Sequence, residues 1–231
     1  MVHGDGRSDE CTLADWVLSE YPDMRDIGEP WEYEHAGKTM TIYRPGIVHR
    51  LDKDTSGIMV LVKNKQAYDF LKNAFKERNI SKTYHAFVYE WPGEISGIID
   101  APIGRHPKDF RARSAGKEAR GTLRDAVTQY QVHDKYLYNN ERYAYLSFSP
   151  QTGRTHQIRV HAKHIHHPLV ADTLYGGKRA QSHHNLGFTR HALHAHTLSF
   201  VDHENNERTY EAPLPEDFQN AQNLLAKKAS L

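Results

Sequence analysis

The chain has 231 residues, and its 30 Lys and Arg nearly balance its 29 Asp and Glu. This length can bury one sizeable core, and no shift in composition marks a boundary, so we expect a single domain over residues 1–231. The balanced charge excludes indiscriminate, purely electrostatic binding to nucleic acid. With one cysteine, Cys11, and no apolar run near the ~20 residues that span a bilayer, we expect a cytoplasmic protein with no membrane partner.

The first sixty residues predict a helix, a turn-rich stretch and two strands. Apolar side chains fall on one helical face over residues 12–21, and Pro22 ends that pattern. Residues 23–38 are mostly polar and carry turn signals, and a short strand is expected over residues 39–43. Residues 58–62, IMVLV, are apolar throughout and partly β-branched, which predicts a strand buried on both faces.

The middle of the chain predicts a helix, a hairpin and a basic loop. Residues 65–78 carry apolar side chains at the spacing of an amphipathic helix. Residues 82–90 are aromatic and β-branched, which predicts a strand with residues 95–99 as its hairpin partner. Residues 104–121 are rich in Arg, Lys and His and nearly lack large apolar residues, so we expect an exposed loop. Two interpretations of this loop stay open: a solubilising segment, or a surface that contacts phosphates.

The last third of the chain predicts further strands and two helices. Alternating or β-branched sequences predict strands over residues 122–132, 142–149, 193–201 and 208–212. Residues 151–164 are expected to start with a turn at Gly153 and to continue as a helix, which Pro168 ends. A second helix is expected over residues 215–228, with a proline in its first turn.

One polar stretch is typical of a reaction centre. Residues 46–57, GIVHRLDKDTSG, place charged and hydroxyl side chains between two glycines and next to apolar runs. Loops that are anchored on rigid elements often carry chemistry, although a solvated turn with alternating charges is the alternative interpretation.

The pattern HRLDKDTSG resembles, residue for residue, the signature of the RluA-type pseudouridine synthases, which isomerise uridine in RNA. Three further segments resemble the family in the family's order: KTYHAFV at 82–88, TGRTHQIRVHAKHIHHPLVADTLYG at 152–176, and ALHAHTLSF at 192–200 with EAPLPEDF at 211–218. The resemblance implies an α+β fold in which helices flank a bent, mainly antiparallel mixed β-sheet. It also implies one catalytic domain, with no separate N-terminal RNA-binding domain.

The resemblance implies the chemistry as well. The N-glycosidic bond of uridine breaks, the base turns, and C5 joins the sugar, which requires an ionised carboxylate but no cofactor and no metal. The residues matching the family's catalytic positions are Asp52 as nucleophile or base, Arg159 as its ion-pair partner, and Tyr84 as a ring that stacks on the base. Covalent attack and a glycal route both stay open. Without the resemblance, Arg159 is an exposed helix residue and Tyr84 a packing residue of a strand.

The resemblance further implies contacts to the substrate, an RNA stem-loop of ribosomal or transfer RNA. A base inside folded RNA must be extruded before it reacts, and Arg50 matches the arginine that assists this step in similar enzymes. Contacts to phosphates and base edges are expected from residues that flank Asp52 and from residues of the GRTHQ segment. The complete set of expected substrate-binding residues is His49, Arg50, Lys53, Arg154, His156 and Gln157.

The 17 histidines raise the alternative of a metal site. His161 and His164 lie one helical turn apart, and further histidines follow at His166, His167, His183 and His184. No cysteine or closely spaced carboxylate completes a tetrahedral set, so we expect surface histidines and no metal.

The chain also departs from the family pattern. Relatives usually begin with one more strand before the region matching Met1, so the first family strand is expected to be missing, and Ala171 stands where relatives often have glycine. The alternative functions are a noncatalytic RNA-binding or RNA-chaperone protein and a His/Asp hydrolase, although no nucleophile turn supports the hydrolase. The enzyme is expected to act as a monomer.

Overall fold

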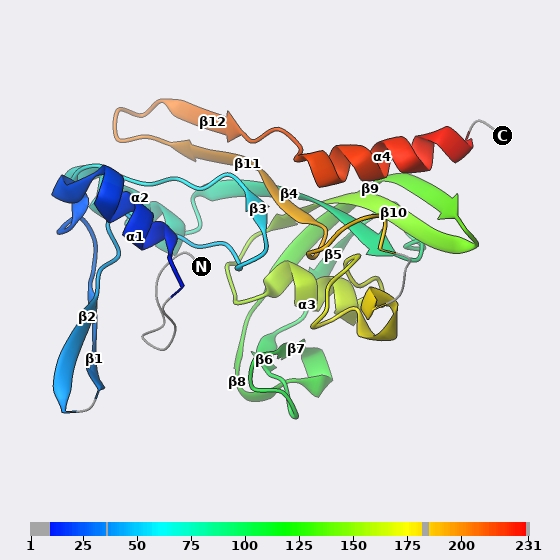
Figure 1. Ribbon diagram of the computed structural model, residues 1–231, viewed down its shortest axis with the longest axis horizontal. Coiled ribbons are helices and arrows are strands. Elements are labelled where there is room, and N and C mark those ends of the chain that lie inside the picture. Colours follow the sequence, from blue (N-terminus) through cyan, green and yellow to red (C-terminus); the bar gives the residue numbers. More distant parts are fainter. Residues whose placement is uncertain (1–9, 36, 182–184, 230–231) are drawn as a thin grey trace. The chain divides into compact units, whose positions relative to one another are not determined.

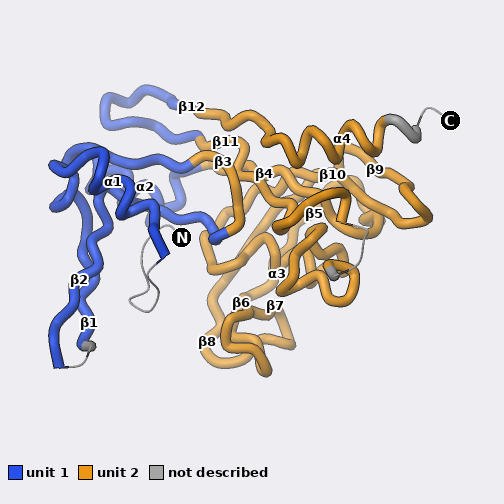
Figure 2. The backbone as a smooth tube through the Cα atoms, in the orientation of Figure 1, with its two compact units in different colours: residues 1–53, 59–80, 199–209 blue, residues 54–58, 81–198, 210–231 orange. Residues whose placement is uncertain are grey.

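The computed structural model of the protein describes residues 10–35, 37–181 and 185–229 (Figure 1). The chain divides into two compact units (Figure 2). The first unit comprises residues 1–53, 59–80 and 199–209, and the second comprises residues 54–58, 81–198 and 210–231. The chain passes from one unit to the other between Lys53 and Asp54, inside the HRLDKDTSG motif.

The first unit contains two helices and a hairpin. Helix α1 (Leu13–Glu20) begins with a capping box in which the Thr12 hydroxyl accepts from the Asp15 backbone N–H and the Asp15 carboxylate accepts from that of Thr12. Helix α2 (Lys65–Lys76) begins at the Asn64 cap and buries Tyr68 and Leu71. The helices expected over residues 12–21 and 65–78 are therefore confirmed.

The hairpin of the first unit is only half predicted by the sequence. Strand β2 (Lys38–Ile42) confirms the strand expected over residues 39–43. Strand β1 (Trp31–His35) lies in the stretch that was expected to be a turn-rich segment, and this part of the prediction is wrong. The reason is the alternation of aromatic and acidic residues in WEYEH, which allows Trp31 to pair with Ile42 and Tyr33 with Met40.

The strand expected over residues 58–62 does not form. Only an isolated bridge between Leu61 and Ile47 occurs there, and of the five residues only Val62 is buried. The backbone N–H of Val60 donates to a histidine side chain, and that of Val62 donates to Gly46 O in a loop. A strand needs a partner strand along its length to make a ladder, and among the described residues this run pairs only at one bridge, which explains the error.

The main sheet is seven-stranded and mixed, and its longest pairings are antiparallel. Its strand order is β12 (Glu207–Glu211), β11 (Leu193–Val201), β4 (Ile80–Tyr89), β10 (Glu141–Pro150), β9 (Val127–Tyr138) and β5 (Ser96–Asp100), and β3 (Ser56–Gly57) joins β11 in parallel. Strand β5 pairs with β9, so the expectation that residues 95–99 form a hairpin with β4 is wrong. Local sequence marks a strand but not its partner, and here β9 supplies a longer edge.

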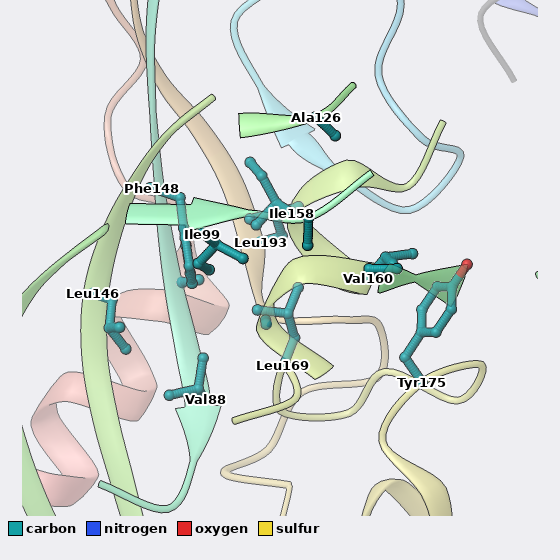
Figure 3. Close-up of a cluster of buried hydrophobic side chains, with 14 of the residues drawn as sticks. Val88, Ile99, Ala126, Leu146, Phe148, Ile158, Val160, Leu169, Tyr175 and Leu193 are labelled. Atoms are coloured by element: carbon teal, nitrogen blue, oxygen red, sulfur yellow. The ribbon is translucent and has the colours of Figure 1, made fainter. Parts of the chain in front are cut away.

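Helices cover both faces of this sheet. Successive residues of β4 point to opposite faces: Ala86 and Val88 pack in the core beneath α3 (Gln157–His164), and Phe87 and Tyr89 pack in the core beneath α4 (Glu216–Ala229). Figure 3 shows the first core, where Val88 and Phe148 of the strands lie among Ile158 and Val160 of α3. The α+β fold with a mainly antiparallel mixed sheet and flanking helices is confirmed.

Residues 104–121 form the expected exposed loop only in part, over residues 106–111. The rest contributes to a separate three-stranded sheet of order β7 (Arg113–Ala115), β6 (Ile103–Arg105) and β8 (Arg120–Arg124). Alanine side chains and Ile103 supply its buried side. The expectation is wrong for these strands because a core made of small residues leaves no strong hydrophobic signal in the sequence. Short 3-10 helices complete the structure at Pro22–Met24, Gly116–Glu118 and Gly177–Gln181.

No helix among the described residues is long and apolar enough to cross a membrane.

Candidate active site

Asp52 lies on a loop of the first unit that is anchored on both sides of the carboxylate. Leu51 is buried with 8% exposure, whereas Asp52 is partly exposed and Arg50 is exposed. His49 holds the loop to the rest of the unit, because its Nε2 accepts a 3.0 Å hydrogen bond from the Val60 backbone and its ring stacks on Phe75 at 4.6 Å. Nε2 is therefore unprotonated, and His49 is already engaged in holding the loop.

Lys53 lies at the end of this part of the loop. Its ammonium group forms a 2.8 Å ion pair with Glu10, and both side chains are more than half exposed. Such pairs contribute little to stability, so Lys53 stays available for exchange with another anion.

The second half of the motif is held by two histidines of the second unit. The Thr55 hydroxyl hydrogen-bonds His191 Nε2 at 2.8 Å, and the Ser56 hydroxyl hydrogen-bonds His194 Nδ1 at 2.9 Å. Both histidines are nearly fully buried, with 4% and 2% exposure. The two hydroxyls of DTSG thus position the chain, a function that the sequence alone did not indicate.

Gly57 follows at the point where the motif meets β11. Its φ of 114° lies in a region that L side chains rarely adopt, and a Cβ there would come within 2.1 Å of Ala195 O. Only glycine fits, because the backbone of β3 approaches that of β11 directly.

Arg159 occupies the centre of the second unit's candidate site. Its Nε and Nη2 donate to the two carboxylate oxygens of Asp172 at 2.7 and 2.9 Å, and the two residues are 8% and 0% exposed. Asp172 also accepts from the backbone N–H groups of Leu174 and Tyr175, both at 3.1 Å. Burial raises the pKa of the Asp172 carboxyl, but the hydrogen bonds and charge of Arg159 outweigh it, so the net pKa lies below its usual value. The alternative interpretation of Arg159 as an exposed helix residue is wrong.

Tyr175 lies against the same guanidinium. The centre of its ring is 5.0 Å from the Arg159 Cζ, a cation–π distance. Its hydroxyl bonds His156 Nδ1 at 2.8 Å and accepts a 2.9 Å hydrogen bond from the Arg113 backbone. Tyr175 therefore links the arginine to the start of α3 and to the small basic sheet.

Gln157 is buried, and its amide group is used within the protein. Its Oε1 accepts from the Thr152 hydroxyl at 2.7 Å and from the Arg154 backbone at 3.0 Å. Its Nε2 donates to Val127 O at 3.0 Å and to the Thr128 hydroxyl at 2.9 Å. Gln157 thus shapes the loop before α3 rather than presenting its amide to solvent.

The helix expected over residues 151–164 begins only at Gln157. His156 has a left-handed φ of 57°, which stops the helix from extending towards the N-terminus. The residues before it form a loop, in which Arg154 Nε donates to Asp125 O at 2.9 Å.

Tyr84 lies on β4 opposite Phe148 and packs, partly buried, against the core beneath α3. Its position on the sheet is compatible with both stacking on a base and packing.

One of the two histidines of α3 differs from the expected surface groups, whereas His164 is exposed as expected. His161 is fully buried, and its two ring nitrogens bond the Thr128 hydroxyl at 2.9 Å and Ala101 O at 3.0 Å. Burial lowers the pKa of the His161 imidazole, so the expectation of a surface histidine is wrong for this residue. His183 and His184 lie outside the described residues. Within the described ranges, no cluster of three or more His, Cys, Asp and Glu is arranged to hold a metal ion.

The expected site residues are distributed over both units. His49, Arg50, Asp52 and Lys53 belong to the first unit, and Tyr84, Arg154, His156, Gln157 and Arg159 belong to the second. Within the second unit, Tyr175 brings His156 and Arg159 together. Asp172 and Tyr175, which contact Arg159, were not among the expected site residues, although both lie in the segment VADTLYG that resembles the family.

Solved structures identify the class of protein that has this fold. The chain resembles human RNA pseudouridylate synthase domain containing 1, with a TM-score of 0.68 and 26% identity over 88% of this chain and 74% of the human one. Human RNA pseudouridylate synthase domain containing 4 gives a TM-score of 0.62 and 27% identity, over 78% of this chain and 75% of that one.

Residues 28–164 match the model of the RNA pseudouridylate synthase family. This match covers more than half of the chain, and the chain belongs to that family. It is 38% identical to an uncharacterized RNA pseudouridine synthase of Synechocystis sp., over 95% of this chain and 61% of that protein. It is 39% identical to the ribosomal large subunit pseudouridine synthase D of Xanthomonas campestris, over 100% of this chain and 65% of that protein. The chain thus spans less than two thirds of the length of these curated relatives, and the resemblance noted in the sequence is confirmed at the level of the family.

Proposed function

We propose that the chain isomerises uridine to pseudouridine in structured ribosomal or transfer RNA, with Asp52 as nucleophile or base and without a cofactor. The observation that carries this proposal is the family's aspartate motif at residues 46–57, which lies inside the matched range and folds as an anchored loop. The similarity to a protein named ribosomal large subunit pseudouridine synthase favours ribosomal RNA as the first substrate to test.

The proposed reaction needs Asp52 ionised beside the sugar and the base. In one route the carboxylate bonds to the sugar or the base as the N-glycosidic bond breaks, and that bond breaks again when C5 joins C1′. In the other route the carboxylate removes a sugar proton as the N-glycosidic bond breaks and returns it when C5 joins C1′. In both routes N1 takes up a proton and C5 releases one to solvent. We assign Arg159 as the cationic partner of Asp52, since a guanidinium keeps its charge when it is buried. We also propose that the whole chain acts as one catalytic domain.

The remaining residues take supporting functions. Tyr84 would stack on the target base, and exposed Arg50 would occupy the space that the flipped base leaves. Lys53 and Arg154, whose charged groups are at least partly exposed, suit phosphate contacts.

His49, His156 and Gln157 have polar groups bonded within the protein. We propose that these three act mainly by holding the loops that carry the reacting groups.

Tritium release from RNA that contains 5-tritiated uridine and lacks its own modifications tests the proposal. The wild-type protein should release tritium into water, and Asp52→Asn should release none, because the amide cannot act as nucleophile or base. Asp54→Asn is the matched control, since it changes an exposed carboxylate two positions away, and it should keep activity within about threefold of wild type. If wild type and Asp52→Asn are both folded, bind RNA and release no tritium, the protein is a noncatalytic RNA binder.

We further propose a monomeric, cytoplasmic enzyme with no metal. Dialysis against a chelator should leave the rate of tritium release unchanged, and sedimentation should give the mass of one chain. A chelator-sensitive rate would contradict the cofactor-free chemistry.

A further inference from the structure

We propose that Asp172 and Tyr175 are positioning residues that hold the Arg159 guanidinium in one orientation for the isomerisation. The inference rests on the proposed function, because it states how Asp172 and Tyr175 assist that reaction.

The first argument is the geometry of the arginine–aspartate pair. Two parallel hydrogen bonds of 2.7 and 2.9 Å join one edge of the planar guanidinium to both oxygens of Asp172. Such a two-point contact fixes both the plane and the rotation of the group, which one bond cannot do. The orientation of the whole guanidinium group is then defined.

The second argument is that Asp172 is itself held in place. Its Oδ1 accepts from the backbone N–H groups of Leu174 and Tyr175, in the turn that follows it. The carboxylate therefore belongs to a fixed backbone turn and cannot follow a moving arginine. The direction of Arg159 is set by the turn rather than by the flexible arginine chain.

The third argument concerns the face of the guanidinium. The Tyr175 ring covers it at 5.0 Å, and the Tyr175 hydroxyl is held by His156 Nδ1 and by the Arg113 backbone. The edge and the face of Arg159 are thus held by two residues of one turn, and the Tyr175 hydroxyl ties that turn to the start of α3 and to β7.

The energetics favour orientation over stability as the reason for this arrangement. Taking two charges out of water costs several kcal/mol per ion, and apolar residues of similar volume often stabilise a core as well or better. The ion pair is almost fully buried and includes the arginine that matches a catalytic position of the family. We explain its burial by its effect on the charge and the orientation of Arg159. It keeps Arg159 charged, dry and fixed.

Kinetics of Asp172→Asn provide the test. The variant keeps the shape of the side chain but removes its charge and places an amide N–H₂ against one guanidinium donor. We expect kcat for tritium release to fall by about 10- to 100-fold while the Kd for RNA stays within about twofold, because misplacement of a reacting group costs rate rather than binding.

Asp109→Asn is the matched control. Asp109 holds Arg111 through the same kind of two-bond contact, at 3.1 and 2.8 Å, but on the exposed surface. This variant should keep the wild-type kcat. An unchanged kcat in a folded Asp172→Asn protein would overturn the proposal.

A second variant keeps the test open if Asp172→Asn does not fold. Tyr175→Phe retains the ring over Arg159 but loses the hydroxyl bonds to His156 and Arg113. We expect a smaller fall in kcat, about three- to tenfold, at an unchanged melting temperature. A wild-type kcat in this variant, together with an unfolded Asp172→Asn, would reduce both residues to a structural function.

A readout independent of activity separates this inference from the proposed function. In wild-type protein labelled with ¹⁵N-arginine, Arg159 should show separate Nη resonances, because its two bonds to Asp172 hinder rotation of the guanidinium. In Asp172→Asn these resonances should merge. If wild-type protein shows no turnover but hindered rotation, the proposed function fails and the positioning of Arg159 stands. If Arg159 rotates rapidly in active wild-type protein, the positioning proposal fails alone.

Discussion

Two arginine–aspartate pairs in the second unit share one geometry and differ in environment. Arg159 and Asp172 are joined by two hydrogen bonds of 2.7 and 2.9 Å, and Arg111 and Asp109 by two of 3.1 and 2.8 Å. The first pair is almost fully buried, whereas the Arg111 side chain of the second is 68% exposed. In both pairs the guanidinium holds the pKa of the carboxyl below its usual value.

The comparison shows that hydrogen-bond distances alone do not determine how strongly the protein responds to the loss of an ion pair. Water solvates the exposed ions and screens their attraction, so water molecules replace the partner of a surface ion when that partner is removed. A buried ion has no water to replace a lost partner, because it was desolvated when the protein folded. Removing the partner therefore leaves its charge uncompensated. The same two bonds therefore predict very different responses to substitution.

The largest expected difference between the two pairs is in stability. Asp172→Ala leaves the charge of Arg159 buried without its carboxylate, and we expect a loss of about 3–5 kcal/mol in the free energy of unfolding. Asp109→Ala should leave the unfolding midpoint unchanged. Urea unfolding followed by circular dichroism measures both variants, and equal shifts of the two midpoints would contradict the comparison.

Acid should distinguish the partly buried His85 from an exposed histidine in the same way. Burial, together with the nearby His196, His133 and His194, lowers the pKa of His85 to about 4, and His85 Nδ1 bonds the Tyr145 hydroxyl. The unfolded chain therefore binds more protons than the folded one between about pH 4 and the ordinary histidine pKa near 6.5. His85 should contribute to a loss of stability as the pH falls through this window.

Melting temperatures measured from pH 7 to pH 4 test this expectation. His85→Gln, which cannot take up the proton, should flatten the pH dependence by a few degrees at pH 5. His203→Gln, which changes an exposed side chain, should leave the wild-type curve unchanged. A His85→Gln curve parallel to that of wild type would show that this histidine is not a source of the acid sensitivity.

The smallest expected effect concerns the backbone beside the buried pair. Ala171 has a left-handed φ of 57° and is 5% exposed. Ala171→Gly relieves strain of about 1–2 kcal/mol but loses a buried methyl group worth about 0.8 kcal/mol and adds freedom to the unfolded chain. The net change should stay within about 1 kcal/mol.

The exposed Asn140, with φ 62° in the turn between β9 and β10, is the comparison for this substitution. Asn140→Gly removes no buried group, and thermal unfolding should show a change no larger than that of Ala171→Gly. A loss of several degrees in Asn140→Gly would mean that the turn depends on its asparagine.

Local patterns predicted many of the elements. The amphipathic spacing over residues 65–78 and the alternation over residues 142–149 correspond to α2 and β10 with small shifts at their ends. The strand expected over residues 193–201 has the same bounds as β11. Periodicity succeeds for α2 because its buried residues lie on one face of the helix. Strand β10 is buried on both faces of the sheet, so its aromatic and apolar composition marks it as a strand.

The failures share a cause, which is that the deciding partner lies far away in the chain. IMVLV at residues 58–62 is strand-like in composition, but within the described ranges its backbone makes only one bond to β11, from Ile58, and one isolated bridge, at Leu61. Residues 104–121 form a small sheet because alanines fit closely under it, which composition does not reveal. Residues 95–99 form the expected strand, but its partner is β9.

For the site, the sequence by itself determined the family and the candidate residues, because the motifs HRLDKDTSG and QIRV can be recognised in the amino-acid sequence without a structure. Only the tertiary structure showed that Arg159 is buried and bound by Asp172, thirteen positions further along the chain, or that Thr55 and Ser56 bond histidines of another segment. The physical reason is that burial and pairing depend on which distant segments pack together. The sequence determines which side chains carry a charge, whereas the fold determines how deeply each one is buried and which groups it contacts.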